Sequence, residues 1–300
     1  MPRIDAHLHV FTRESAEFPR TPTKVCPAER AEPVEKLLTE MEESRIDQAV
    51  LVQFGGGRIE QHAYLRHCLA TYSDRFLGIG LFPPRCEEPE THMDRLAADG
   101  GLIGFRLGLL GGPRDPFAPM DVRRFSSYRI WKHAAERDYV LWLYIKSAEA
   151  HLTAWLLEAF PQVRVVFNHL GICPGKGKFS WDEKGRPRID TPSYNYSRHT
   201  IYNLTRYENV TVHLSGQYAF SREAFPYRDL AVWHRILFDA FGPKRLMWAT
   251  DAPWIYEDPG YGALTTVIRK LLPNLPEADY ADMMGGTAQR VLRFPAHRTD

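Results

Sequence analysis

Short apolar runs recur along the whole chain, and most of them are separated by stretches with helical spacing. The runs are mostly continuous rather than alternating, as is typical of parallel strands buried on both faces. They cover residues 4–11, 48–54, 76–82, 102–110, 139–145, 163–170, 210–216 and 245–251. Residues 33–44 and 147–160 place apolar side chains three and four positions apart, which predicts amphipathic helices. The pattern is therefore one of strands alternating with helices.

Eight strands with intervening helices predict the α/β class and, within it, a single (β/α)8 TIM barrel. The chain has 300 residues, a usual length for one such barrel. We find no internal repeat, low-complexity segment or linker that would divide it. We therefore expect one barrel domain over residues 1–300.

Two segments are too long and polar to be plain connections between elements. Residues 12–31 contain three prolines, and residues 171–197 contain several basic side chains. Both segments follow predicted strands, so in a barrel both would lie over the C-terminal face, where active sites form. The second is either a solvated surface loop or a basic lid over an acidic substrate. Its basic residues are Lys176, Lys178, Lys184, Arg186 and Arg188.

Polar side chains fall in the middle or at the C-terminal end of seven of the eight predicted strands. Such residues are costly in a buried apolar run unless they have partners. Several of them at similar levels of different strands indicate a site rather than core filling. They are Gln53, Arg106, Tyr144, Lys146, His7, His9, His169, His213 and Asp251.

The first predicted strand places two histidines on one face, because residues i and i+2 of a strand point the same way. These are His7 and His9, in the stretch IDAHLHVF. They are either core histidines bonded to backbone carbonyls, or part of a metal site or an acid/base cluster. With His169 and Asp251 at other strand ends, we favour a functional cluster.

Composition and charge limit the classes of binding partner and the cellular compartment that we expect. A formal net charge of +1 gives no indication of a nucleic-acid or membrane partner, and a homo-oligomer is compatible with the sequence. The four cysteines are scattered, with neither zinc-motif spacing nor a disulfide framework. We see no signal segment before the first strand and no apolar run of transmembrane length. We therefore expect a cytoplasmic protein that acts on a small molecule.

Three motifs, in order along the chain, resemble the amidohydrolase superfamily: IDAHLHVF, the HLG after the sixth strand and the TDAPW after the eighth. The segments FGPKRLMWATDAPW and GGTAQRVLRF extend the likeness over nearly the whole chain. The closer similarity is to the amidohydrolase-related branch, which holds sugar lactonases, 2-pyrone-4,6-dicarboxylate lactonase and metal-dependent decarboxylases. HVFTRESAEFP, IDQAVLVQ and VHLSGQY resemble the lactonases in particular.

The chain also departs from these patterns. His213 stands where the lactonases of the branch often have lysine or arginine, and FGGGRIEQH differs from their usual segment after the second strand. In the decarboxylases the fifth strand supplies a histidine ligand, whereas this chain reads LYIKSA around Lys146. The resemblance thus implies a lactonase-like hydrolase. The alternatives are a non-oxidative decarboxylase of an aromatic or muconate-type acid and a non-catalytic ligand-binding barrel.

The resemblance implies that Asp251 is the base that activates water. His7, His9 and His169 with Asp251 can bind a divalent ion, for which zinc is favoured by nitrogen and oxygen ligands. The same imidazoles can instead donate hydrogen bonds to the oxyanion, as in lactonases of the branch that work without metal.

The other polar residues at the strand ends suit contacts with an anionic substrate. Arg106 is either the anchor for a substrate carboxylate or a structural ion pair. His213 is either a general acid, a hydrogen-bond donor or a packed core histidine. Tyr144, Lys146 and Gln53 are further candidates for substrate contact.

Overall fold

The computed structural model describes residues 1–24, 26–113, 115, 120–172, 178–190 and 202–295. Eight parallel strands form one sheet in the order β1-β2-β3-β4-β5-β6-β9-β10, which follows the chain. The strands are β1 (Ile4–Leu8), β2 (Gln48–Val52), β3 (Phe76–Leu81), β4 (Leu102–Leu107), β5 (Val140–Leu143), β6 (Val165–Phe167), β9 (Val210–Leu214) and β10 (Leu246–Trp248). Every predicted strand is present, and the predicted TIM barrel is confirmed.

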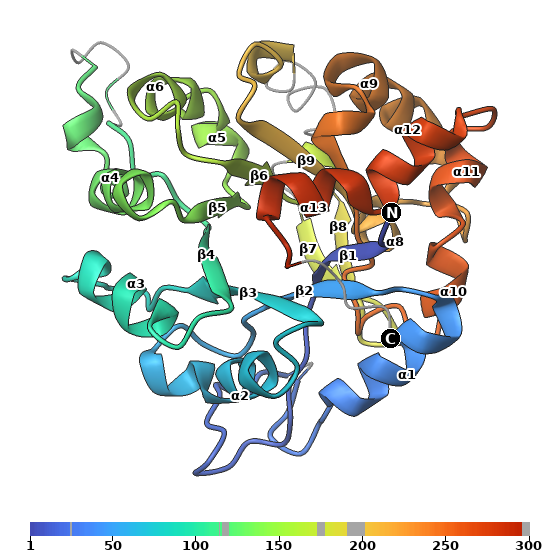
Figure 1. The fold of residues 1–300 in the computed structure, drawn as a ribbon, viewed down its shortest axis with the longest axis horizontal. Helices are drawn as coiled ribbons and strands as arrows, with labels where there is room; N and C mark the ends of the chain where they lie inside the picture. Colours follow the sequence, from blue (N-terminus) through green and yellow to red (C-terminus); the bar gives the residue numbers. More distant parts are fainter. Residues whose placement is uncertain (25, 114, 116–119, 173–177, 191–201, 296–300) are drawn as a thin grey trace.

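Helices surround the sheet and cover its outer face (Figure 1). The larger ones are α1 (Val34–Ser44), α2 (Ala63–Thr71), α3 (Pro89–Ala97), α4 (Tyr128–Arg137), α6 (Thr153–Ala159) and α9 (Ala231–Phe241). The shorter ones are α5 (Ser147–Ala150), α8 (Gln217–Phe220), α10 (Tyr261–Leu264), α11 (Val267–Leu271), α12 (Glu277–Ala281) and α13 (Thr287–Leu292). Single helical turns are η1 (Ile59–His62), η2 (Val122–Arg124), η3 (His169–Gly171), η4 (Arg228–Leu230) and η5 (Pro243–Arg245), and η6 (Asp282–Gly286) is a π-helical segment.

The core has two parts, one inside the barrel and one between the strands and the helices. Alternate strand residues such as Ile4, Val50 and Trp142 form the inner part, together with Leu292 of α13. Helix α13 lies across the middle of the barrel in Figure 1 and closes its N-terminal end. The larger outer part includes Leu37 and Met41 of α1. Burial on both faces explains why the strands read as continuous apolar runs.

Backbone hydrogen bonds join the two edge strands just beyond their C-terminal ends. The Asp251 amide donates to the His7 carbonyl at 2.9 Å, and the His9 amide donates to the Ala252 carbonyl at 2.8 Å. These bonds lie at the C-terminal mouth, so closure of the barrel itself brings Asp251 to His7 and His9.

Asp5 reinforces the same junction from within the protein. Its buried carboxylate accepts from the backbone amide of Thr250 at 2.9 Å, from the Thr250 hydroxyl and from the Tyr261 hydroxyl. A longer bond of 3.3 Å comes from the His7 amide. Burial raises the pKa of Asp5 to about 6, against the lowering effect of these donors. The first and last strands are therefore tied on both sides of the site.

The polar segment over residues 171–197 contains an unpredicted antiparallel hairpin, formed by β7 (Lys178–Trp181) and β8 (Pro187–Asp190). Arg186 pairs with Asp182 at 2.8 Å and with Asp258 at 3.0 Å, and Lys184 also reaches Asp258. The guanidinium of Arg188 donates to the backbone carbonyls of α8 at Tyr218 and of Ser221.

These contacts bear on the two interpretations of the basic segment. Arg186 and Arg188 fix the hairpin to the barrel, so their charges are engaged within the protein. Lys178 is exposed, and Lys176 lies outside the described residues. Lys184 is likewise engaged with Asp258, so the proposal of a basic lid over an acidic substrate stays a prediction that rests on Lys178 among the described residues.

A single buried arginine organises the first long loop. Arg20 donates to the backbone carbonyls of Thr12, Cys26, Pro27, Ala28 and Arg30 at 2.5–3.1 Å. Its guanidinium also lies 5.4 Å from the centre of the Phe11 ring. One side chain thus ties five backbone carbonyls of the loop together.

We expect Arg20→Met to destabilise the protein by about 2–4 kcal/mol, because several carbonyls lose a charged donor at once. For a chain of this size the melting temperature should fall by roughly 5–10 °C in differential scanning calorimetry. Arg13→Met is the matched control, since Arg13 is exposed in the same loop. Equal melting temperatures for the two variants would show that Arg20 does not hold the loop.

Within the part of the chain that the structure describes, no helix combines the length and the apolar character needed to cross a bilayer.

Candidate active site

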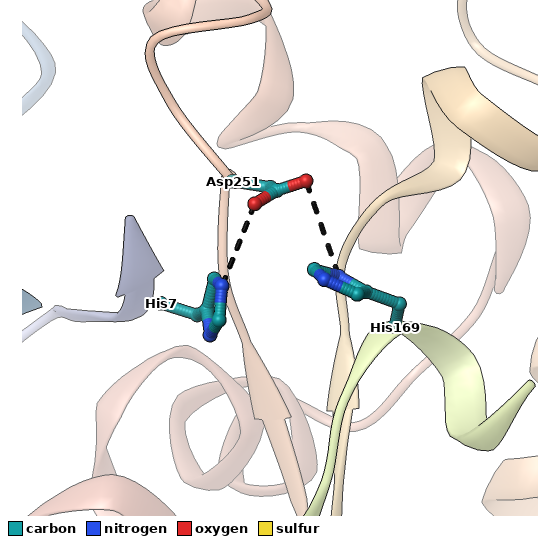
Figure 2. A group of neighbouring side chains, drawn as sticks. All are labelled: His7, His169 and Asp251. Carbon is teal, nitrogen blue, oxygen red and sulfur yellow. Dashed lines mark ion pairs between the residues drawn. The ribbon is translucent and has the colours of Figure 1, made fainter. Parts of the chain in front are cut away.

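Four buried side chains from three parts of the chain meet at the C-terminal mouth of the barrel. His7 and His9 come from the end of β1, His169 from η3 after β6, and Asp251 from the segment after β10. Figure 2 shows the imidazoles of His7 and His169 on either side of the Asp251 carboxylate. The structure thus brings together the four residues that the sequence predicts as one cluster.

An irregularity in β1 aims the two histidines. Ile4 and Ala6 belong to the inner core, whereas Leu8 belongs to the outer core. The pairing of β1 with β2 shifts register between Asp5 and Leu8, so that His7 follows Ala6 into the barrel instead of pointing away from it. Such bulges often re-aim a side chain next to an active site.

The distances around Asp251 are longer than hydrogen bonds. Oδ1 lies 3.5 Å from Nε2 of His7 and 3.6 Å from Nε2 of His9, and Oδ2 lies 4.0 Å from Nδ1 of His169. Among the described residues, Tyr218 makes the one short side-chain contact, a hydrogen bond of 2.6 Å from its hydroxyl to Oδ2. The carboxylate therefore faces three nitrogens across gaps that a small species can bridge.

Two residues of the cluster have left-handed backbone. His169 has φ of 46° and Asp251 has φ of 58°. This conformation is uncommon for residues other than glycine, asparagine and aspartate, and it persists where the surroundings fix it. At Asp251 the bond from its amide to the His7 carbonyl supplies that constraint.

Second hydrogen bonds orient the three imidazoles. Nδ1 of His9 lies 2.8 Å from the Val52 carbonyl, and Nδ1 of His169 lies 3.0 Å from the Ser215 hydroxyl. Nδ1 of His7 accepts from the indole N–H of Trp142 at 3.2 Å. His7 and His9 are thus held through Nδ1 while Nε2 faces Asp251, whereas His169 uses Nδ1 both for Ser215 and toward Asp251.

Burial decides the charge state of the cluster. It lowers the pKa of His7 well below its usual value and that of His169 to about 3, so both are neutral near pH 7. Burial works to raise the pKa of Asp251, but the imidazoles of His169, His7 and His9 hold it well below the usual range. The site therefore holds one carboxylate beside the neutral imidazoles of His7 and His169, and an ionised carboxylate is the form that a general base requires.

Donor spacing makes this cluster a candidate metal site. One ligand atom from each of His7, His169 and Asp251 lies within 4.8 Å of the others, and all three residues are buried. His9 adds a further nitrogen facing Asp251. Among the described residues, Nε2 of His7 has no hydrogen-bond partner. Nitrogen and carboxylate oxygen donors suit zinc, so the donor set as a whole fits such an ion.

Arg106 and Tyr144 lie beside the cluster. The Arg106 guanidinium stacks 4.7 Å from the centre of the Tyr144 ring, and that ring meets His169 edge-on at 5.2 Å. Among the described residues, no carboxylate lies within ion-pair distance of Arg106, whose pKa is lowered by burial. Both side chains line a hollow of about 600 Å³ with Phe82, Pro84 and Ile130 among its apolar walls. The hollow therefore offers one uncompensated cation in apolar surroundings.

His213 is completely buried on β9, 5.4 Å from the His7 ring by centroids. Neither of its ring nitrogens has a hydrogen-bond partner in the described part of the chain. A buried N–H without a partner is costly, so this ring has the capacity to donate to a bound molecule.

Gln53 and Lys146, both predicted to contact substrate, lie away from the cluster around Asp251 or are engaged elsewhere. The side-chain amide of Gln53 donates to the carbonyls of Phe54, Gly56 and Gln61, so it shapes the loop after β2. Lys146 is exposed and lines a separate hollow with Glu149 and His151. Their roles in substrate binding stay predictions.

Sequence reasoning missed Tyr218 and Trp142, which touch the cluster directly. Trp142 lies within an apolar run and is indistinguishable there from core filling. Tyr218 is the last residue of VHLSGQY, a segment whose resemblance to the lactonases gives this tyrosine no role of its own. Only the assembled barrel shows what either side chain contacts.

We expect Tyr218→Phe to lower turnover by roughly 10- to 100-fold, since a hydrogen bond to a charged group contributes about 1.5–3 kcal/mol. Burial and Asp251 raise the pKa of Tyr218, so its hydroxyl stays protonated and donates. The loss should also raise the pKa of Asp251, which steady-state kinetics across pH would show as an acidic limb moved upward. An unchanged pH profile with unchanged turnover would contradict this role.

The chain was compared with known proteins. A family model described as Amidohydrolase matches residues 4–294. No curated protein matches the chain. Among solved structures, an amidohydrolase from Burkholderia multivorans has 20% identity and a TM-score of 0.74, with 98% of this chain and 100% of that chain covered. That protein has been solved with bound HEPES and with bound zinc.

Two further solved structures with this fold are named for different reactions, one as a probable hydrolase and one as a decarboxylase. A probable 2-pyrone-4,6-dicarboxylic acid hydrolase from Acinetobacter baumannii, with citric acid bound, has 17% identity and a TM-score of 0.71, covering 98% of this chain and 100% of that chain. The 5-carboxyvanillate decarboxylase from Sphingomonas paucimobilis has 16% identity and a TM-score of 0.60, covering 98% and 99%. At these identities the likeness shows the fold.

Proposed function

The chain belongs to the amidohydrolase family, and on that premise we propose that it is a hydrolase that opens a small lactone or cyclic ester bearing a carboxylate. The observation that carries the proposal is the ionised Asp251 carboxylate, separated by 3.5–4.0 Å from nitrogens of three imidazoles. An enzyme of this superfamily with a fixed carboxylate base and nearby N–H donors is equipped for attack by water on a carbonyl.

The proposed reaction begins with water between Asp251 and His9. Asp251 takes a proton as the water oxygen bonds to the lactone carbonyl carbon. The carbonyl oxygen becomes negative and is stabilised by imidazole N–H groups, for which His7 and His213 are the candidates. The ring C–O bond then breaks, and the leaving oxygen receives the proton held by Asp251. The products are a carboxylic acid and an alcohol or enol on one open chain.

Arg106 and Tyr144 are assigned to substrate binding. A carboxylate on the substrate would pair with the guanidinium, which has no described carboxylate partner. The apolar walls of the same hollow suit an unsaturated or aromatic ring. The citric acid bound by the Acinetobacter baumannii protein accords with a carboxylate ligand in this fold.

A divalent ion is a second element of the proposal, and zinc is the ion we propose. The zinc bound by the Burkholderia multivorans protein accords with this choice. Its ligands would be drawn from His7, His9, His169 and Asp251. Such an ion would polarise the carbonyl and acidify the attacking water.

The proposal places the reaction in the cytosol, with a small anionic substrate and neither nucleic acid nor membrane as partner. The described cysteines Cys26, Cys68 and Cys86 are free thiols, as suits a reducing compartment.

A substrate panel read by two assays tests the proposed reaction. Lactone opening near pH 7 releases a proton without carbon dioxide, whereas decarboxylation of an aromatic acid releases carbon dioxide. We expect rapid proton release with carboxylated lactones and much slower release with their neutral methyl esters. Carbon dioxide release from aromatic acids, with all lactones inert, would replace the hydrolase by a decarboxylase. Neither activity across the panel would favour the ligand-binding barrel.

A further inference from the structure

The hydrogen bond between Trp142 and His7 fixes where the His7 proton sits. Both residues are completely buried, and the indole Nε1 lies 3.2 Å from Nδ1 of His7. An indole N–H can only donate, so Nδ1 of His7 must accept. A ring whose Nδ1 carries no proton is neutral and carries its single proton on Nε2, the atom that faces Asp251.

His9 has the opposite arrangement. Its Nδ1 lies 2.8 Å from the Val52 carbonyl, which can only accept, so Nδ1 carries the proton. In the neutral ring, the lone pair of Nε2 then points at the site. The two histidines therefore have opposite hydrogen-bonding roles toward the same Asp251 oxygen. His7 offers an N–H at 3.5 Å, and His9 offers a lone pair at 3.6 Å.

We infer that Trp142 is a positioning residue that holds the His7 proton on Nε2, which makes His7 a hydrogen-bond donor in the site and excludes it from the coordination shell of a metal ion. A metal ligand must offer a lone pair, and metal-binding histidines usually donate their other N–H to a carbonyl or carboxylate, as His9 does to Val52. If Nε2 of His7 coordinated an ion, Nδ1–H would face the indole N–H at 3.2 Å, and the buried indole would lose its acceptor.

Of the three residues that share ligand spacing, His169 and Asp251 then remain as candidate metal ligands, and His9 joins them through Nε2, which lies 3.6 Å from Oδ1 of Asp251. Nε2 of His7 remains free to donate to the carbonyl oxygen of a substrate as that oxygen becomes negative. This role rests on the proposed function, whereas the proton position and the exclusion from the metal shell do not.

Histidine nitrogen resonances test the proton position directly. Long-range ¹⁵N–¹H correlation spectra of the metal-free, histidine-labelled protein distinguish the two tautomers, and His7→Gln assigns the His7 signals. We expect Nε2–H for His7 and Nδ1–H for His9 in the wild type. A His7 ring protonated on Nδ1 in the wild type would overturn the inference, and this measurement does not depend on any variant of Trp142.

Titration with zinc alone tests the exclusion from the shell. We expect His9→Gln to weaken zinc binding at least 10-fold, and His7→Gln to change it less than about twofold. Trp142→Phe should raise zinc affinity roughly 10- to 100-fold, and that gain should disappear when His7→Gln is added. Equal losses for His7→Gln and His9→Gln in the wild-type background would show that His7 is a ligand after all.

A matched control separates the role of Trp142 from general loss of a buried indole. Trp248→Phe also removes a buried indole N–H, which donates to the Leu264 carbonyl at 3.0 Å rather than to a histidine. We expect this variant to leave zinc affinity and the His7 signals unchanged. Melting temperatures of both tryptophan variants show whether each is folded. None of these readouts uses turnover, so a wrong substrate assignment and a wrong tautomer assignment give different results.

Discussion

Replacing Asp251 by asparagine is expected to lower turnover by roughly 10²–10⁴-fold, the range that a positioned general base contributes. The amide keeps the shape of the carboxylate and can still accept from the Tyr218 hydroxyl, which reaches Oδ2 at 2.6 Å. It cannot take a proton from water, so the step that generates the nucleophile is lost. Stopped-flow or steady-state proton release with a carboxylated lactone measures the effect.

The comparison variant for this prediction is Asp74→Asn. Asp74 is an exposed aspartate just before β3, at the end of the barrel opposite the mouth that holds Asp251. It should turn over substrate at the wild-type rate. If Asp251→Asn is folded by circular dichroism and retains near-normal turnover, Asp251 is not the base and the proposed mechanism fails.

Replacing Arg106 by glutamine should reduce kcat/KM for a carboxylated lactone by roughly 30- to 1,000-fold, the usual cost of truncating one partner of a buried charge pair. Most of the loss should appear in KM, because the guanidinium binds a part of the substrate that does not react. Glutamine preserves much of the side chain's length and its stacking on Tyr144. Initial-rate kinetics over a range of substrate concentration separate the two constants.

Two comparisons make this prediction specific to charge recognition. Arg106→Lys keeps the positive charge without the planar fork, so it should recover part of the lost affinity. The methyl ester of the same lactone has no carboxylate to bind, and any slow turnover of it should be unaffected by Arg106→Gln. A similar loss with acid and ester would mean that Arg106 supports the fold of the hollow rather than the substrate.

Eight strands were predictable because burial on both faces leaves each of them as a continuous apolar run. Residues 76–82 and β3 (Phe76–Leu81) differ by one residue, whereas residues 163–170 shrink to β6 (Val165–Phe167). The shortening at β6 has a physical reason, since His169 and Leu170 adopt positive φ and turn the chain away from the sheet. The apolar runs predict that the strands are present, but the residues at which each strand ends depend on local backbone geometry that the apolar pattern does not encode.

The hairpin could not be predicted from the sequence, because its first strand is exposed and shows no apolar run. Strand β7 is exposed along its whole length and has a mixed sequence, KFSW, so no buried pattern marks it. The hairpin is instead held by Arg186, Arg188 and Lys184 to distant parts of the chain. Charged side chains in a polar stretch are compatible with either a solvated or an anchored segment.

The candidate site was predictable in its members but not in their roles. His7, His9, His169 and Asp251 stood out because polar residues at several strand ends need a common explanation. Which nitrogen of each histidine carries a proton depends on contacts far along the sequence, such as that between Trp142 and His7. Those contacts arise only when the barrel closes.

The hairpin's anchorage has a consequence for attempts to redesign the enzyme. Arg188 of the hairpin donates a hydrogen bond to the backbone carbonyl of Tyr218, and the hydroxyl of the same tyrosine donates to the Asp251 carboxylate. Exchanging the hairpin for a relative's, in order to admit a bulkier substrate, would therefore also disturb the base. A graft that keeps Arg188 and varies the exposed positions Phe179 and Trp181 should leave the carboxylate in place. The hairpin and the base are thus linked through one tyrosine, so changes at single exposed positions of the hairpin spare a link that exchange of the whole hairpin would break.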